Sequence, residues 1–127
     1  MLICYDVRMA NAHIKTAASN LQRAAQDMRE EETRIKNDIT RAKQQALTSI
    51  KNLKTQSADL EARKRDARTP DAERVAIDRQ QKNIQNQIAE IEKNTKQSEQ
   101  EALNHVSEME SAESEFQNIA GRLDNIA

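Results

Sequence analysis

Apolar residues recur through the second half of the sequence in alternating steps of four and three residues, from Ile77 to Ile126. A seven-residue repeat of this kind is typical of a helix that packs along a partner helix in a left-handed coiled coil. We therefore predict one long helix with a narrow apolar seam. The predicted seam consists of Ile77, Gln81, Ile84, Ile88, Ile91, Thr95, Ser98, Ala102, His105, Met109, Ala112, Phe116, Ile119, Leu123 and Ile126.

The first half carries a second ladder with the same spacing, interrupted once. Its positions are Ile14, Ala18, Leu21, Ala25, Met28, Glu32, Ile35, Ile39, Ala42, Ala46, Ile50, Leu53, Ser57, Leu60, Lys64 and Ala67. Between Ala46 and Ile50 the ladder takes a second consecutive step of four. Such a stutter locally unwinds a supercoil, so we expect straighter packing at this point.

The two ladders are separated by a short break around Thr69 and Pro70. Thr69 suits the N-cap of the second helix and Pro70 its first position, while proline disfavours helical geometry at Thr69 itself. We predict a single domain, residues 1–127, with a helix over about 7–68, a turn at 69–70 and a helix over about 71–126. So short a connection folds the helices back on each other, which gives an all-α, antiparallel helical hairpin. One helix kinked at Pro70 is the alternative.

Composition and charge agree with a hairpin. The 127 residues include one Gly and one Pro, too few turn formers for many short strands. A hydrophobic content of 36% is compatible with disorder, but the strict periodicity favours helix. Residues 1–69 carry 14 Lys and Arg against 9 Asp and Glu, whereas residues 70–127 carry 6 against 12. A basic helix beside an acidic one favours their mutual pairing.

The apolar stripes are wider than a two-helix seam requires, as they are in the helices of a bundle. The apolar residues beside the ladders are Ala17, Ala24, Leu47, Val75, Leu103 and Val106. We expect a four-helix bundle, built from two hairpins (a homo-oligomer) or from one hairpin and another helical protein. The seam residues predicted to bind the partner are Leu21, Met28, Ile35, Ile39, Ile84, Ile88, Ile91, Met109, Phe116, Ile119 and Leu123.

Two polar residues, Glu32 and His105, fall on predicted seam positions. Folding about Thr69 and Pro70 places residues whose numbers add to about 139 opposite each other, so we predict that these two lie close together. A buried polar pair can set the register of a coiled coil. The alternative is that both point partly into solvent.

No set of residues suggests catalysis, so we expect a non-enzymatic protein with no catalytic residues, no metal site and no cofactor. His13 and His105 lie in opposite halves without a ligand partner at helical spacing, and Cys4 is most simply a reduced thiol. Arg63, Lys64 and Arg65 are interleaved with acidic residues, so nucleic-acid binding is disfavoured. No membrane span and no signal peptide are apparent. We expect a cytoplasmic protein, with secretion without a cleavable signal peptide as the alternative.

Four features together carry a family resemblance: the start with Tyr5 and Asp6, the Ala-rich amphipathic helix, the central break, and the segment from Phe116 to Asp124. In these the chain resembles the small helical-hairpin proteins of type VII secretion, namely the WXG-type family and the accessory proteins of LXG toxins. The resemblance implies a targeting or chaperone-like protein that packs against a toxin's helical domain. It also implies an export surface with Phe116 as its aromatic residue and a turn around Gly121. The acidic residue expected four positions after the aromatic is Ala120 here, and Asp124 is the next acidic residue.

Two further functions stay open on the sequence. One is a coiled-coil scaffold or assembly adaptor of a phage, a secretion apparatus or a cytoskeletal system. The other, which we rank lower, is a nucleic-acid-associated helical protein that binds through the basic cluster at residues 63–68. A neighbouring toxin or secretion gene favours the secretion hypothesis, and neighbouring structural-assembly genes favour the scaffold.

Overall fold

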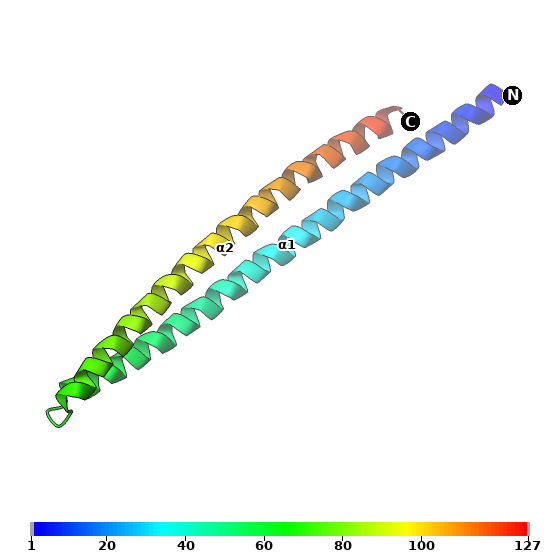
Figure 1. The fold of residues 1–127 in the computed structure, drawn as a ribbon. Helices are drawn as coiled ribbons and strands as arrows, with labels where there is room; N and C mark the ends of the chain where they lie inside the picture. Colours follow the sequence, from blue (N-terminus) through cyan, green and yellow to red (C-terminus); the bar gives the residue numbers. More distant parts are fainter. Residues whose placement is uncertain (1, 127) are drawn as a thin grey trace. The chain divides into compact units, whose positions relative to one another are not determined.

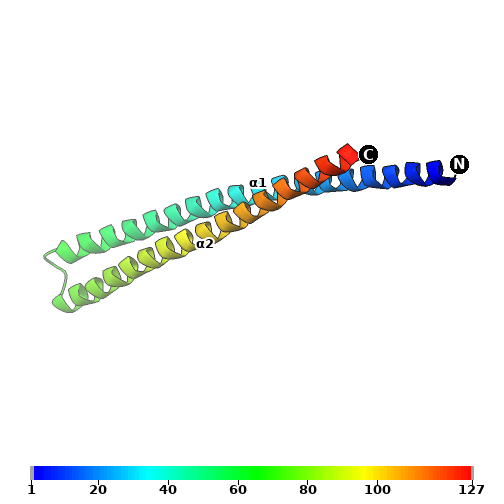
Figure 2. The ribbon, with the colours of Figure 1, turned by 90° about the horizontal axis from the view of Figure 1, so that it is seen from above.

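The computed structural model describes the backbone of residues 2–126 and the side chains of residues 7–126. It contains two helices, α1 (Leu2–Arg65) and α2 (Asp71–Ile126), which form an antiparallel hairpin (Figures 1 and 2). The predicted all-α hairpin is therefore confirmed. The predictions about the side chains of Cys4, Tyr5 and Asp6 lie outside the described residues.

The chain divides into two compact units. The first consists of Met1–Asn37 and Ala102–Ala127, and the second of Asp38–Glu101, which includes the turn. Each unit therefore pairs one segment of α1 with one segment of α2.

The connection between the helices is longer than predicted, because α1 ends at Arg65 rather than near residue 68. Asp66 causes the early end. Its Oδ1 accepts a hydrogen bond from the Arg68 backbone N–H at 3.0 Å, and its carbonyl accepts one from the Thr69 N–H at 3.0 Å. A carboxylate that bonds the backbone two residues ahead offers the chain a turn in place of another helical turn.

The predicted N-cap role of Thr69 was wrong. Its hydroxyl donates to the carbonyl of Arg63 at 2.6 Å, so it satisfies one of the carbonyls left without a partner at the end of α1. The first hydrogen bond of α2 runs from the Arg74 N–H to the Pro70 carbonyl at 3.1 Å. Asp71 and Glu73 then lie in the first turn of α2, where acidic side chains complement the helix dipole.

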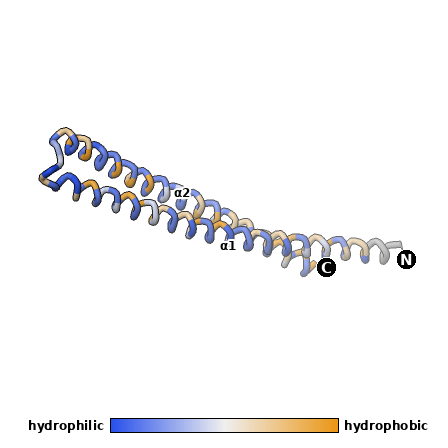
Figure 3. Tube along the Cα trace, turned by 90° about the horizontal axis from the view of Figure 1, so that it is seen from below, coloured by the Kyte–Doolittle hydropathy of each residue, from blue (hydrophilic) through white to orange (hydrophobic). Residues whose placement is uncertain are grey.

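The buried part of the hairpin is small. Among the described residues, no large side chain is fully buried. Apolar positions recur along both helices (Figure 3), as the two ladders predict. The buried apolar residues are Ala18, Ala25, Ile77, Ile84, Val106 and Ala120.

Beyond Thr95 the predicted seven-residue repeat of the second helix holds at Ala102, Met109, Phe116 and Leu123, which are half-buried, and is wrong at alternate positions. His105 and Ile119, both predicted on the seam, are exposed. Val106 and Ala120, one position further on, are buried instead. Alternate seam positions of α2 therefore move by one residue beyond Thr95, while the positions between them stay as predicted.

A second stutter explains this shift. α2 takes two consecutive steps of four, from Ile91 through Thr95 to Glu99, and all three side chains are half-buried. Ala46 and Ile50 of α1 line the same groove as Thr95 and Glu99, so the stutters of the two helices lie at the same level. A stutter changes the direction in which a stripe faces, and the partner stripe must change with it to stay in contact.

Candidate interaction surface

Most of the predicted seam side chains lie between the two helices, but few are fully covered. Ile84 is buried, whereas Ile119 is 44% exposed and lies outside the seam. The others are half-buried: Leu21, Met28, Ile35, Ile39, Ile88, Ile91, Met109, Phe116 and Leu123.

Glu32 is buried in the seam, but its neighbour is not His105, which is exposed. The predicted pairing of these two residues was wrong. The carboxylate of Glu32 instead lies near that of Glu113, which forms an ion pair with Arg29. The Oε1 atom of Glu32 is buried without a hydrogen-bond partner.

This environment disfavours the charged form of Glu32. Burial raises the pKa of its carboxyl above the ordinary value, and a hydrogen bond with the Glu113 carboxyl adds to the rise. The negative charges of Glu113 and Glu110 act in the same direction, and only Lys36 opposes them. Glu32 is thus a destabilising residue within the helix pair at neutral pH.

The register of the hairpin is visible in its ion pairs. Lys43 Nζ lies 2.6 Å from Glu99 Oε1, and Lys64 Nζ lies 2.6 Å from Asp78 Oδ1. The residue numbers add to 142 in both pairs, whereas the predicted register gives about 139. The two helices are therefore displaced relative to each other by a few residues from the predicted register. In the cross-helix ion pairs the cation lies on α1 and the anion on α2, as the charge split predicts: Arg29–Glu113, Lys36–Glu110, Lys43–Glu99, Arg63–Glu73 and Lys64–Asp78.

Polar contacts near the turn hold the register as well. Gln81 Nε2 donates to Glu61 Oε2 at 2.9 Å and to the Ser57 carbonyl at 3.3 Å. The hydrogen bond from Gln81 is the main reason that the pKa of Glu61 is lowered. Correspondingly, the hydrogen bond to Asp78 raises the pKa of Lys64. The amide of Gln81 on the seam therefore has hydrogen-bond partners on the opposite helix.

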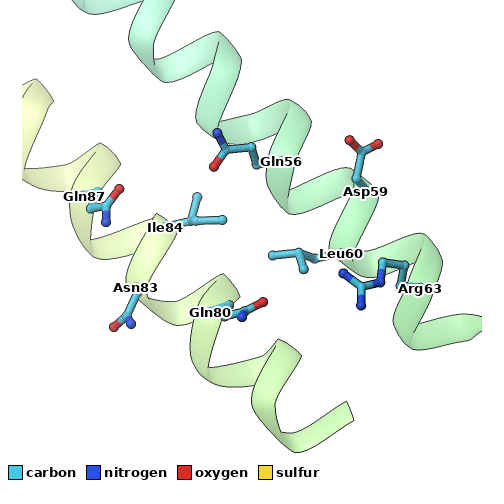
Figure 4. A pocket seen from close by; sticks show the side chains of 8 residues that line it. All are labelled: Gln56, Asp59, Leu60, Arg63, Gln80, Asn83, Ile84 and Gln87. Atoms are coloured by element: carbon cyan, nitrogen blue, oxygen red, sulfur yellow. The ribbon is translucent and has the colours of Figure 1, made fainter. Parts of the chain in front are cut away.

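One open groove of about 480 Å³ lies between the helices in the second unit. Figure 4 shows Leu60 of α1 and Ile84 of α2 pointing toward each other at its centre. Around them the groove is lined by Gln56, Asp59, Arg63, Gln80, Asn83 and Gln87. The groove therefore combines the apolar side chains of Leu60 and Ile84 with amides that can form hydrogen bonds.

A different groove lies at the level of the stutters. It has a volume of about 390 Å³ and exposes Leu47 and Ile50 between Lys43 and Lys96. A second hollow of about 480 Å³ continues it along α1 and shares Leu47 and Ile50. We call the combined surface the stutter groove; it is lined by Lys43, Ala46, Leu47, Ile50, Lys51, Lys54, Thr55, Ala58, Glu92, Thr95, Lys96 and Glu99.

The side chains at the stutters explain why the hairpin is open here. Ala46 and Thr95 have small side chains, so neither helix fills the space between the helices at the level of the stutters. A further hollow of about 190 Å³, lined in part by Ala42 and Ser98, lies at the same level. The sequence shows the stutter of α1, but the groove requires the matching stutter of α2, which the sequence reading missed.

Exposed large apolar side chains occur in both units. Leu47 is the most exposed of those in the second unit, at 67%. Over residues 7–126 the exposed large apolar residues are Val7, Met9, Leu47, Val75, Leu103, Ile119 and Ile126. Leu47, Val75 and Leu103 are among the residues that the sequence predicts beside the seam.

The export surface expected from the family resemblance is altered in one respect. Gly121 lies within α2 and has no positive φ, so there is no turn at this residue. Phe116 is half-buried, and Asp124 is exposed on the same helix. The geometry therefore offers a continuous helical surface here.

Within the described residues, no His, Cys, Asp or Glu cluster of three or more could hold a metal ion. Over the same residues, neither helix has an apolar stretch of the kind that crosses a membrane. Comparisons with family models, curated proteins and solved structures give no match. The resemblance to type VII secretion hairpins stays a prediction.

Proposed function

We propose that this chain is a non-enzymatic protein–protein interaction module whose helices complete their apolar packing against another helical chain. The observation that carries the proposal is the contrast between an incomplete core and exposed apolar side chains. No large side chain is fully buried among the described residues, whereas Leu47 is 67% exposed and Val75 is 52% exposed.

The total surface supports the same conclusion. The chain exposes 9793 Å². A globular monomer of 14.5 kDa exposes about 6,900 Å². The difference is larger than the surface that a specific interface of standard size buries on one partner, about 800 Å². A partner helix pair can therefore cover a large part of the surface that the hairpin leaves open.

The positions of the exposed residues favour a four-helix assembly. Leu47 follows the half-buried Ala46 by one residue, and Leu103 follows the half-buried Ala102 in the same way. Apolar residues beside a seam widen the stripe to the extent seen in bundle helices. The groove in Figure 4 surrounds Leu60 and Ile84 with four amides, one carboxylate and one guanidinium, all of which can form hydrogen bonds with a partner chain.

Sedimentation velocity on the full chain, combined with far-UV circular dichroism, tests this function. We expect the isolated chain either to associate, or to stay monomeric with incomplete helix that becomes complete when a partner is added. A monomer that is fully helical and unfolds cooperatively at about 1 µM would contradict the proposal, because such a chain gains nothing from a partner.

A further inference from the structure

We propose that the stutter groove binds a second copy of this chain, through the acidic strip on α2 formed by Glu108, Ala112, Glu115 and Ile119. This inference rests on the proposed function and names the partner. The groove belongs to the second unit of one copy, and the acidic strip belongs to the first unit of the other.

The groove is suited to an acidic helix. Lys51, Lys54 and Lys96 line it and form no ion pair within the described part of the chain. Lys43 is already neutralised by Glu99 at 2.6 Å. Residues 39–58 contain four Lys or Arg residues and no Asp or Glu. The lining of the groove as a whole contains four lysines against Glu92 and Glu99, so its net charge is positive.

The acidic strip has the opposite character. Residues 97–121 contain six Glu residues and no Lys or Arg. Glu108 and Glu115 are exposed and form no ion pair within the described residues, whereas Glu110 and Glu113 pair with α1. Ile119, at 44% exposure, supplies the apolar anchor of the strip.

The spacing of the two surfaces also matches. Leu47, Lys51, Lys54 and Ala58 follow one another along α1 at steps of four, three and four, which places them on one face. The acidic strip has the same steps. Antiparallel docking brings Leu47 against Ile119 and Lys51 against Glu115, while Lys54 lies between Ala112 and Glu108. Leu47 then meets an apolar residue and Lys51 meets a glutamate, while Lys54 faces Ala112 and lies one helical turn from Glu108.

The contact joins two different surfaces of the chain. If the groove of the second copy also binds the acidic strip of the first, the interface is isologous and closes at two copies; if it does not, the contact is heterologous. In the heterologous case each added copy leaves another groove open, and larger assemblies form as concentration rises.

A charge-swap experiment on the full chain tests the docking. One variant carries Lys51→Glu and Lys54→Glu, and the other carries Glu108→Lys and Glu115→Lys. The four positions are exposed on helices, so both variants should keep the circular dichroism spectrum of the parent. We expect each variant alone to lose self-association by about tenfold or more, and their equimolar mixture to regain it.

The matched control is Lys82→Glu with Lys93→Glu. It makes the same change in net charge as the Lys51 and Lys54 variant, but on exposed positions outside the groove. This control should associate like the parent. Sedimentation velocity at about 0.1 M salt measures all five samples: the parent, the two variants, their mixture and the control.

The outcomes separate the two proposals. A parent chain that associates while the groove variant associates equally well overturns the groove but leaves the interaction module standing. The same holds if the parent is a poorly helical monomer, because its partner is then another protein. A fully helical, cooperative monomer overturns both proposals.

Discussion

Replacing Val106 with alanine tests which residues of α2 face α1 beyond Thr95. In an unbroken seven-residue repeat His105 faces α1 and Val106 points away. In the structure Val106 is 3% exposed and His105 is exposed. The Val106→Ala substitution therefore removes buried methyl groups only if the seam changes from His105 to Val106 because of the two matched stutters.

The expected loss follows from the burial of the side chain. Valine to alanine removes the equivalent of two buried methylene groups, each worth about 0.8 kcal/mol, and leaves a small cavity. We expect Val106→Ala to lower the free energy of unfolding by about 1.5–2.5 kcal/mol. For a chain of this size that corresponds to a fall in Tm of about 5–12 °C.

Thermal unfolding followed by circular dichroism, at one fixed protein concentration, measures the effect. His105→Ala is the matched control, because a substitution at an exposed position changes stability by about 0.5 kcal/mol or less. Ile84→Ala, at a buried position near the turn, should cost about 2–4 kcal/mol and shows that the assay detects seam losses. If His105→Ala destabilises the chain more than Val106→Ala does, the matched stutters are refuted.

Three further substitutions test local features. The folded state holds the Glu32 proton more tightly, so stability should fall as pH rises from the ordinary pKa of 4.5 through the raised pKa. Glu32→Gln should remove this fall. If the urea midpoint of the variant depends on pH as strongly as that of the parent, Glu32 is not the cause. Thr69→Val should cost about 1 kcal/mol in urea unfolding by removing the hydroxyl bond to Arg63, whereas Thr48→Val, whose hydroxyl bonds a carbonyl within the helix, should cost less; equal losses would speak against the cap. Gly121→Ala should raise stability by up to about 1 kcal/mol, since an added Cβ meets nothing within 4 Å in a helix; a lower Tm would indicate a turn instead.

Much of the fold follows from the sequence because long-range order here depends on a simple repeat. The two ladders identify both helices, and Pro70 identifies the break. The end of α1 is harder to predict, since Asp66 and Thr69 can each form hydrogen bonds in two ways. Thr69 could cap the start of α2 or bond the Arg63 carbonyl at the end of α1, as it does. Asp66 could continue the helix or accept a hydrogen bond from the Arg68 N–H, and the bond from Arg74 of α2 to the Asp66 carbonyl supports the turn.

The partner-facing surface is less predictable for a different reason. The frame of α2 beyond Thr95 depends on the stutter of α1, so it cannot be read from α2 alone. That stutter was visible at Ala46 and Ile50, and the rule that facing stripes must stay in contact would have moved the seam from His105 to Val106. The stutter groove would then have followed from Leu47 and its lysines.

The dependence of unfolding on protein concentration tests most directly whether the hairpin needs another helical chain. In a complex of two copies, dilution favours the unfolded or dissociated state, so Tm must rise with concentration. Over a range of about 1–100 µM, we expect Tm of the parent chain to rise by several degrees. A sharp, cooperative transition with the same Tm across that range, from a fully helical chain, would contradict the account.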